Sequence, residues 1–128
     1  MNDTLPPIVL GDADHDILSN LADACAAAMP DVASYLAREL DRARVVPDAR
    51  VPDDVVALGS ALSYRDETTG AERRVTLVRP GEEDIAAGRI SVMTPVGAAL
   101  IGLAAGQSIT WETRRGAPRT LTVLGVGR

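Results

Sequence analysis

One junction constrains the fold of this chain more than any other stretch. A short apolar run, residues 89–93, leads directly into Thr94 and Pro95. Thr94 is a favoured helix N-cap type, and Pro95 suits the first helical position, where a backbone N–H has no partner within the helix. The apolar residues that follow predict a short helix, which Gly102 or Gly106 can end. A strand that passes into a capped helix, with almost no ionisable side chains, favours contact with another protein over turnover of a substrate.

The composition excludes several classes of protein. The chain has 128 residues, enough for one domain or for a small domain with an appendage. Its net charge of −5 argues against independent, specific binding to nucleic acid. Cys25 is the single cysteine, which excludes an internal disulfide and fits a reducing compartment. No apolar run approaches the ~18 residues that cross a bilayer, and no signal-peptide pattern is present, so we expect a soluble, cytoplasmic protein that does not bind membranes.

Two helices are predicted in the first part of the chain. Residues 14–28 and 31–43 carry apolar side chains at helical spacing, and Pro30 interrupts the pattern. The short connection predicts an antiparallel helical hairpin. At 1.5 Å per residue, arms of about fifteen residues are only ~22 Å long. Residues 45–54 contain two prolines and are typical of a linker.

The second half of the chain has the pattern of short strands. Residues 66–70 are a turn sequence, residues 73–79 predict a return strand that ends at Pro80, and residues 82–87 predict a helical turn. A second hairpin, with its turn at residues 114–118, closes the chain. Alternation from residue 55 onward places one set of side chains on a common face: Leu58, Ser60, Leu62 and Tyr64. Five strands and one helix predict an α+β fold with a mostly antiparallel sheet wrapped on that helix.

The order of these motifs resembles a known family. Residues 78–80 are followed by residues 88–92, by Thr94-Pro95 and by residues 99–102, which read Ala-Leu-Ile-Gly. The GreA and GreB transcript-cleavage factors typically carry Gly-x-Ile-Ser-x-x-Ser-Pro and then Ala-Leu-x-Gly in their C-terminal domain. Residues 39–43, 51–56 and 92–103 resemble the Rnk type of this family. The resemblance implies a short helical hairpin, a truncated coiled coil, over residues 1–46 and an FKBP-like domain over residues 47–128.

The resemblance also implies a function. Gre-type factors dock this domain on the rim of the secondary channel of RNA polymerase, and the acidic tip of their long coiled coil helps to bind a catalytic Mg²⁺. The Rnk type has the docking domain without the long arm, which implies a monomeric, non-catalytic regulator of transcription elongation. Such a protein would compete with Gre factors without promoting cleavage. The expected hairpin tip offers only Asp31, with Asp23 one turn below, so we expect neither a metal site nor a cofactor.

The resemblance places the docking loop at Met93, Thr94 and Pro95. Family members often carry Asp or Asn, then Ser, then Pro, so Thr94 keeps the hydroxyl group whereas Met93 lacks the polar side chain. Glu83 and Asp84 are expected to face a basic surface of RNA polymerase. From the residues alone, a solvated helical turn explains these two carboxylates more simply.

Two other functions match parts of the chain. An FKBP-like fold suggests a peptidyl-prolyl isomerase, but active members line their pocket with aromatic side chains, and this chain has no Phe, two Tyr and one Trp. The Rnk type is also known as a regulator of nucleoside diphosphate kinase. The chain carries no P-loop and no nucleotide-binding fingerprint, so we expect any effect on nucleotide metabolism to be indirect.

Several reactive side chains have simpler structural roles. His15 is expected to be solvated near a helix start, because no second histidine or paired cysteine accompanies it. Cys25 and Trp111 are expected in the core. The three aspartates among residues 12–16 fit the N-terminal end of a helix, where negative charge is favoured.

Overall fold

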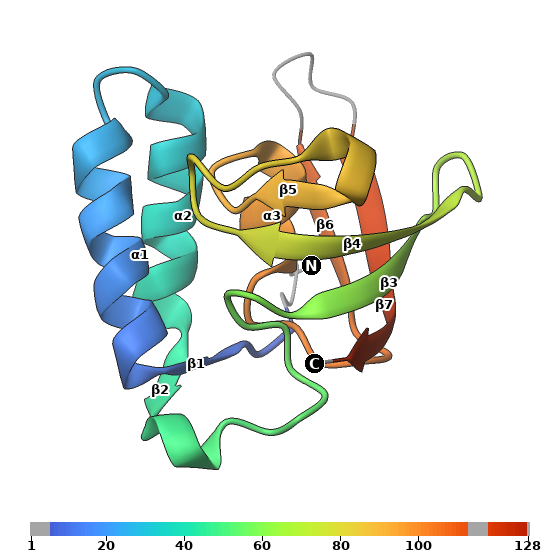
Figure 1. Cartoon of the computed structure of the whole chain (residues 1–128), viewed down its shortest axis with the longest axis horizontal. Helices are drawn as coiled ribbons and strands as arrows, with labels where there is room; N and C mark the ends of the chain where they lie inside the picture. Colours follow the sequence, from blue (N-terminus) through green and yellow to red (C-terminus); the bar gives the residue numbers. More distant parts are fainter. Residues whose placement is uncertain (1–5, 113–117, 128) are drawn as a thin grey trace.

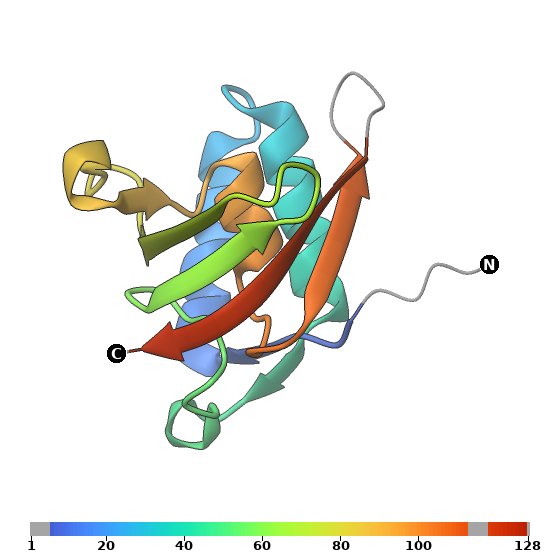
Figure 2. The same cartoon turned by 90° about the vertical axis from the view of Figure 1, so that its right-hand side faces the viewer.

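The computed structural model describes residues 6–112 and 118–127, with the backbone alone for residues 111 and 112. Helices α1 (Asp12–Cys25) and α2 (Pro30–Arg42) lie side by side at one end of the molecule (Figure 1). The short helix α3 (Pro95–Leu100) lies between them and a five-stranded sheet, as Figure 2 shows from the side. The predicted α+β class, with N-terminal helices followed by a sheet, is therefore confirmed.

The two helices form the predicted hairpin, with bounds slightly earlier in the chain than expected. The amide N–H of Met29 donates to the carbonyl of Cys25 at 2.8 Å, which closes the turn between the helices. Pro30 is the first residue of α2, where its missing N–H costs nothing, so it begins the second helix instead of preceding it. With 14 residues, α1 is roughly 21 Å long.

The expected linker is an ordered part of the fold, which corrects the prediction for residues 45–54. Strand β2 (Arg44–Val46) pairs in parallel with β1 (Val9–Gly11), and the helical hairpin is the crossover between them. The short 3₁₀ helix η1 (Asp48–Arg50) follows. Its Asp48 carboxylate accepts a hydrogen bond from the amide N–H of Ala13 at 3.0 Å, in the first turn of α1. Asp48, a residue expected in a linker, therefore accepts from a backbone N–H in the first turn of α1, a helix that has no side-chain cap of its own.

The main sheet has the strand order β5-β4-β3-β7-β6. Its strands are β3 (Ala61–Asp66), β4 (Glu72–Val78), β5 (Arg89–Ser91), β6 (Ser108–Glu112) and β7 (Pro118–Gly127). All neighbours are antiparallel except β4 and β5, which are parallel. The predicted hairpins and the mostly antiparallel sheet are confirmed, and β5 and β6 are its two edge strands.

The strand predicted from residue 55 begins only at Ala61, although Ser60, directly before it, is also buried and Leu58 packs against the core. Leu62 and Tyr64 are buried on the core face, as expected. Leu58 and Ser60 lie before the strand, in a turn where the hydroxyl of Ser60 accepts from the amide N–H of Ala57 at 2.9 Å. Gly59 has a φ of +87° there, a conformation that a strand does not allow. The expected core position of Trp111 and most of the turn at 114–118 lie outside the side chains and residues that the structure describes.

One apolar core includes residues from both the hairpin and the sheet. Leu18 and Leu36 of the hairpin belong to the same buried cluster as Leu100 of α3. The N-terminal segment also reaches this core, because the amide N–H of Val9 donates to the carbonyl of Gly102 at 3.1 Å. The hairpin therefore packs against the sheet-bearing part of the chain, and the core continues across the boundary predicted at residues 46 and 47.

Candidate functional site

The strand-to-helix junction has the geometry that the sequence predicts. The hydroxyl of Thr94 accepts a hydrogen bond from the amide N–H of Gly97 at 3.0 Å and donates one to the carbonyl of Ser91 at 2.8 Å. Pro95 occupies the first turn of α3. The amide N–H of Met93 donates to the Ser91 hydroxyl at 3.0 Å. Two hydroxyl groups therefore fix the angle between the end of β5 and the start of α3.

A glycine makes this close approach possible. A Cβ atom at Gly97 would lie 2.3 Å from the carbonyl oxygen of Ser91 and 2.9 Å from the Cα of Val92. Both neighbours are backbone atoms, so no side-chain movement could relieve the clash. The start of α3 therefore lies directly against the strand that precedes it.

The three residues expected in the docking loop differ in exposure. Pro95 is exposed and Thr94 is partly exposed. Met93 is only 3 % exposed and belongs to the apolar core. The side chain of Met93 therefore presents almost no surface to a partner, and contact between this residue and a partner stays a prediction. The residue lies between the buried end of the strand and the helix, and an apolar side chain at this position stabilises the core.

The second expected site, around Glu83 and Asp84, is a closed loop. Residues 81–88, here called the 81–88 loop, contain the 3₁₀ helix η2 (Ile85–Ala87), which is shorter than the predicted helical turn. Asp84 and Arg89 exchange two backbone hydrogen bonds of 2.8 and 3.0 Å at the base of the loop. The carboxylate of Asp84 accepts from the amide N–H of Ala87 at 3.3 Å, and Gly88 ends the turn with a φ of +75°.

The other two carboxylates of this loop bond either to its own backbone or to Arg79, which precedes it. Glu83 accepts from the amide N–H of Gly81 at 2.6 Å. Glu82 forms an exposed ion pair with Arg79 at 3.7 Å, which is worth little on its own. Arg89 donates from its Nε to the carbonyl of Glu82 at 3.0 Å. Glu83 and Asp84 are exposed, as the prediction requires, and they also shape the loop that carries them.

The loop and the junction belong to one continuous segment. Residues 81–95, here called the β5 edge, comprise the 81–88 loop, the edge strand β5 and the start of α3. At about 3.3 Å per residue, the three residues of β5 span roughly 7 Å, and a turn at residues 92 and 93 then leads to Thr94. The structure thus brings the expected residues Glu83, Asp84, Thr94 and Pro95 to the same edge of the sheet, at the two ends of β5.

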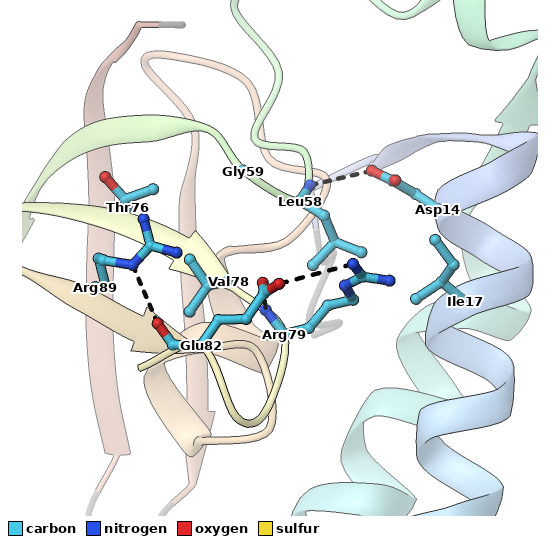
Figure 3. Close-up of a pocket in the computed structure, with 9 residues that line it drawn as sticks. All are labelled: Asp14, Ile17, Leu58, Gly59, Thr76, Val78, Arg79, Glu82 and Arg89. Carbon is cyan, nitrogen blue, oxygen red and sulfur yellow. Dashed lines mark hydrogen bonds and ion pairs between the residues drawn. The ribbon is translucent and has the colours of Figure 1, made fainter. Parts of the chain in front are cut away.

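A cavity of about 340 Å³ lies between α1 and this edge (Figure 3). Its lining residues are Asp14, Ile17, Leu58, Gly59, Thr76, Val78, Arg79, Glu82 and Arg89. The two arginines are matched by two carboxylates, so the cavity carries no excess charge that would select an anionic ligand. None of the nine lining residues is aromatic. On one wall, the amide N–H of Leu58 donates to the carboxylate of Asp14 at 3.1 Å, which links the hairpin to the loop before β3.

The hairpin tip places Asp23 and Asp31 on the surface, on different helices. Within the described residues, no group of three or more His, Cys, Asp or Glu side chains could hold a metal ion. In the same part of the chain, no helix is both long and apolar enough to cross a membrane.

The base of the hairpin is held by a nearly buried ion pair. Glu39, which is 4 % exposed, accepts from Nε and Nη2 of Arg42, each at 2.8 Å. This hydrogen bonding raises the pKa of Arg42 above its ordinary value. Arg42 also donates to the carbonyl of Pro6, which ties the N-terminal segment to the end of α2. Burial raises the pKa of Tyr35, one turn before Glu39, well above its ordinary value.

Two residues of the hairpin have surroundings that the sequence did not fully predict. His15 is partly buried, with its Nε2 3.3 Å from the carbonyl of Leu40, so the ring is less exposed to solvent than expected. The reason is its position facing the C-terminal end of α2, where the carbonyl of Leu40 also accepts from the amide N–H of Ala43 at 3.4 Å. Cys25 is partly buried and packs against the apolar core, which agrees with its expected structural role.

Ile85 is an exposed residue that the sequence pattern does not reveal. This residue is 78 % exposed, the largest exposure among the large hydrophobic residues that the structure describes. Its position within an expected helical turn gave no signal, because an isolated apolar residue in a short turn does not define a face.

Comparison with known proteins yields two family models that together match most of the chain. Residues 51–128 match the model described as transcription elongation factor GreA/GreB, C-term, and residues 6–46 match the Rnk N-terminus. A curated protein of Escherichia coli K12, called regulator of nucleoside diphosphate kinase, is 39% identical over 119 residues, which cover 93% of this chain and 88% of that protein.

Other relatives are transcription elongation factors by name. GreA of Azorhizobium caulinodans is 38% identical over 79 residues, and the match spans 62% of this chain but only 50% of that protein. A solved structure called prokaryotic transcription elongation factor GreA/GreB, from Nitrosomonas europaea, has a TM-score of 0.74 and 32% identity. It covers 96% of this chain and 99% of its own, so the similarity includes both the helices and the sheet.

Proposed function

Because this chain belongs to the GreA/GreB family of transcription elongation factors and carries the Rnk type of N-terminus, we propose that it regulates elongation by docking on RNA polymerase without catalysing transcript cleavage. The docking surface is the β5 edge, and the place of docking is the rim of the secondary channel. There the protein competes with Gre factors for the same surface. In this proposal it acts as a monomer and needs no cofactor of its own.

The observation that carries the proposal is the construction of the β5 edge. Thr94 makes both of its hydrogen bonds inside the junction, so the exposed Pro95 is held at a fixed position. At the other end of β5, the hydrogen bonds of Glu83 and Asp84 hold the loop closed. A surface that is ordered before binding loses little conformational entropy when a partner docks.

The hairpin supports docking without entry into the channel. Its α1 arm has 14 residues, or roughly 21 Å, and α2 packs against α3. An arm held in this way cannot also extend from the domain to a distant active site. The match to GreA of A. caulinodans covers half of that protein, which supports a shared docking domain.

The proposal is tested by transcript cleavage in a stalled elongation complex. We expect the full chain alone to produce no cleavage above the level of polymerase, and to reduce Gre-stimulated cleavage as its concentration rises. The variant Thr94→Arg places a long cation in the docking surface and should lose this inhibition, whereas Thr94→Ser keeps the hydroxyl group and should retain it. Stimulation of cleavage by the chain alone, or inhibition unchanged in Thr94→Arg, would contradict the proposal.

A second candidate function rests on the name of the E. coli relative, regulator of nucleoside diphosphate kinase, which is 39% identical over most of the chain. In this alternative the chain alters the activity of that kinase directly. A reconstitution with purified kinase and the purified chain distinguishes the two. A kinase rate that changes with the concentration of the chain supports the alternative, and an unchanged rate removes it.

A further inference from the structure

The 81–88 loop presents one large apolar side chain to solvent. Ile85 is 78 % exposed, compared with 41 % for Val45 and 38 % for Leu124, the other exposed large hydrophobic residues in the described part of the chain. A single exposed apolar residue is common on protein surfaces and means nothing by itself. What distinguishes Ile85 is the structure that holds it.

The conformation of the loop around Ile85 is fixed from within. Asp84 bonds to Arg89 through two backbone hydrogen bonds, and its carboxylate accepts from Ala87. The amide N–H of Gly88 donates to the carbonyl of Ile85 at 3.0 Å, which closes the 3₁₀ turn. The turn therefore holds the side chain of Ile85 in solvent, and a partner can bind this side chain without any ordering of the loop.

The charge beside Ile85 restricts the kind of partner. Glu82, Glu83 and Asp84 directly precede it, and residues 81–88 contain no basic residue. Glu82 is paired with Arg79, whereas Glu83 and Asp84 are exposed and use one oxygen each for the bonds that shape the loop. An apolar side chain beside negative charge is complementary to an apolar pocket bordered by arginine or lysine.

We propose that Ile85 is the apolar anchor of the β5 edge and inserts into a pocket bordered by basic residues on a protein partner. The inference rests on the proposed function, in which that partner is RNA polymerase. The loop projects from the sheet in Figure 2 and is joined through β5 to Thr94 and Pro95. One partner surface can therefore contact both the anchor and the junction.

The test compares three variants of the full chain in binding to immobilised core RNA polymerase. Ile85→Ser removes the apolar side chain, and we expect binding at least about tenfold weaker, because a buried anchor contributes more than its neighbours. Ile85→Leu keeps the apolar volume and should bind within about threefold of the unmodified chain. Val45→Ser is the matched control, since Val45 is exposed on β2, away from the loop (Figure 1).

A further variant tests the charge. Glu83→Gln keeps an oxygen that can accept the hydrogen bond of Gly81 but removes the negative charge. We expect its association rate to fall severalfold at low salt, with the dissociation rate nearly unchanged, because rim charges act mainly on encounter. An unchanged association rate would contradict the basic border of the pocket.

The outcomes separate the anchor from the proposed function. If the unmodified chain binds and Ile85→Ser binds equally well, Ile85 is not an anchor, and the proposal that the chain docks on RNA polymerase is retained. If the unmodified chain does not bind at all, both the role of Ile85 and the proposed docking on RNA polymerase are wrong. Melting temperatures complete the test. Because Ile85 and Val45 are exposed, both serine variants should have the same melting temperature as the unmodified chain.

Discussion

The polar side chains of the helical hairpin and those of the β5 edge have different structural roles. In the hairpin, Glu39 and Arg42 bond to each other, Arg42 also bonds to the N-terminal segment, and the apolar face of both helices lies in the core. In the β5 edge, the carboxylates of Glu83 and Asp84 accept hydrogen bonds from the backbone of their own loop, and Ile85 lies in solvent. The comparison teaches that the hairpin is part of the common core, whereas the β5 edge, which we propose as the docking surface, holds its exposed residues with bonds inside its own loop.

The largest expected effect tests whether the hairpin is structural. Leu36 of α2 is fully buried in the common core, so Leu36→Ala should lower the free energy of unfolding by about 3 kcal/mol. Because the core is shared, denaturant unfolding should remain a single transition, followed by far-UV circular dichroism. Two transitions, with the sheet unfolding as in the unmodified chain, would show that the hairpin is a separate unit.

The next effect tests the boundary between the core and the β5 edge. Gly97→Ala forces a Cβ against backbone atoms of Ser91 and Val92, and we expect a loss of about 2 kcal/mol in unfolding free energy. The same substitution shifts the start of α3 and should weaken binding to RNA polymerase. Calorimetry and a binding titration on the same sample measure both. A stable Gly97→Ala variant would show that the junction tolerates movement.

A smaller effect is expected at the helix cap. Thr94→Ala removes the hydroxyl that accepts from Gly97 and donates to Ser91, which should cost about 1 kcal/mol. Thr94→Ser should restore nearly all of this stability, since it keeps the hydroxyl group. Equal stability of the alanine and serine variants in thermal denaturation would show that the Thr94 hydroxyl does not stabilise the start of α3.

The smallest effect concerns a region that belongs to neither element, the pairing of β3 with β7. Burial raises the pKa of Asp66, but hydrogen bonds from Arg119 and from the backbone outweigh it and lower the pKa below its ordinary value. A carboxyl with a lowered folded-state pKa stabilises the fold above its unfolded pKa, near 4, and loses this contribution as the pH falls further.

Asp66→Asn therefore should be less stable than the unmodified chain at pH 7, by up to about 1 kcal/mol because Arg119 is partly exposed. The difference should shrink as the pH falls below about 4. Denaturant titrations of both proteins at several pH values measure it. A difference that stays constant down to pH 2 would contradict the assigned pKa direction.

The sequence predicts those parts of the fold that depend on neighbouring residues. The Thr94 cap, Pro95 at the helix start and the strand predicted over residues 73–79 all follow from local spacing, and the structure contains them. Parallel pairing of β1 with β2 joins residues about 35 positions apart in strands of three residues each, too short to show alternation. The linker prediction failed for this reason.

The candidate site was predictable in position but not in exposure. Glu83, Asp84, Thr94 and Pro95 lie together along one edge, as the order of the motifs suggests. Whether a side chain at this edge points inward or outward depends on how the strand meets α3 and how the loop closes. Met93 is buried and Ile85 exposed for that reason, and neither could be derived from periodicity in segments this short.

The central claim is tested most directly by competition for RNA polymerase. Labelled full chain is bound to core enzyme, and an unlabelled Gre factor is then added in increasing amounts. We expect saturable binding of the chain, complete displacement by the Gre factor, and no saturable binding of Thr94→Arg. Binding that persists at saturating Gre factor, or the absence of any binding by the unmodified chain, would contradict docking through the β5 edge.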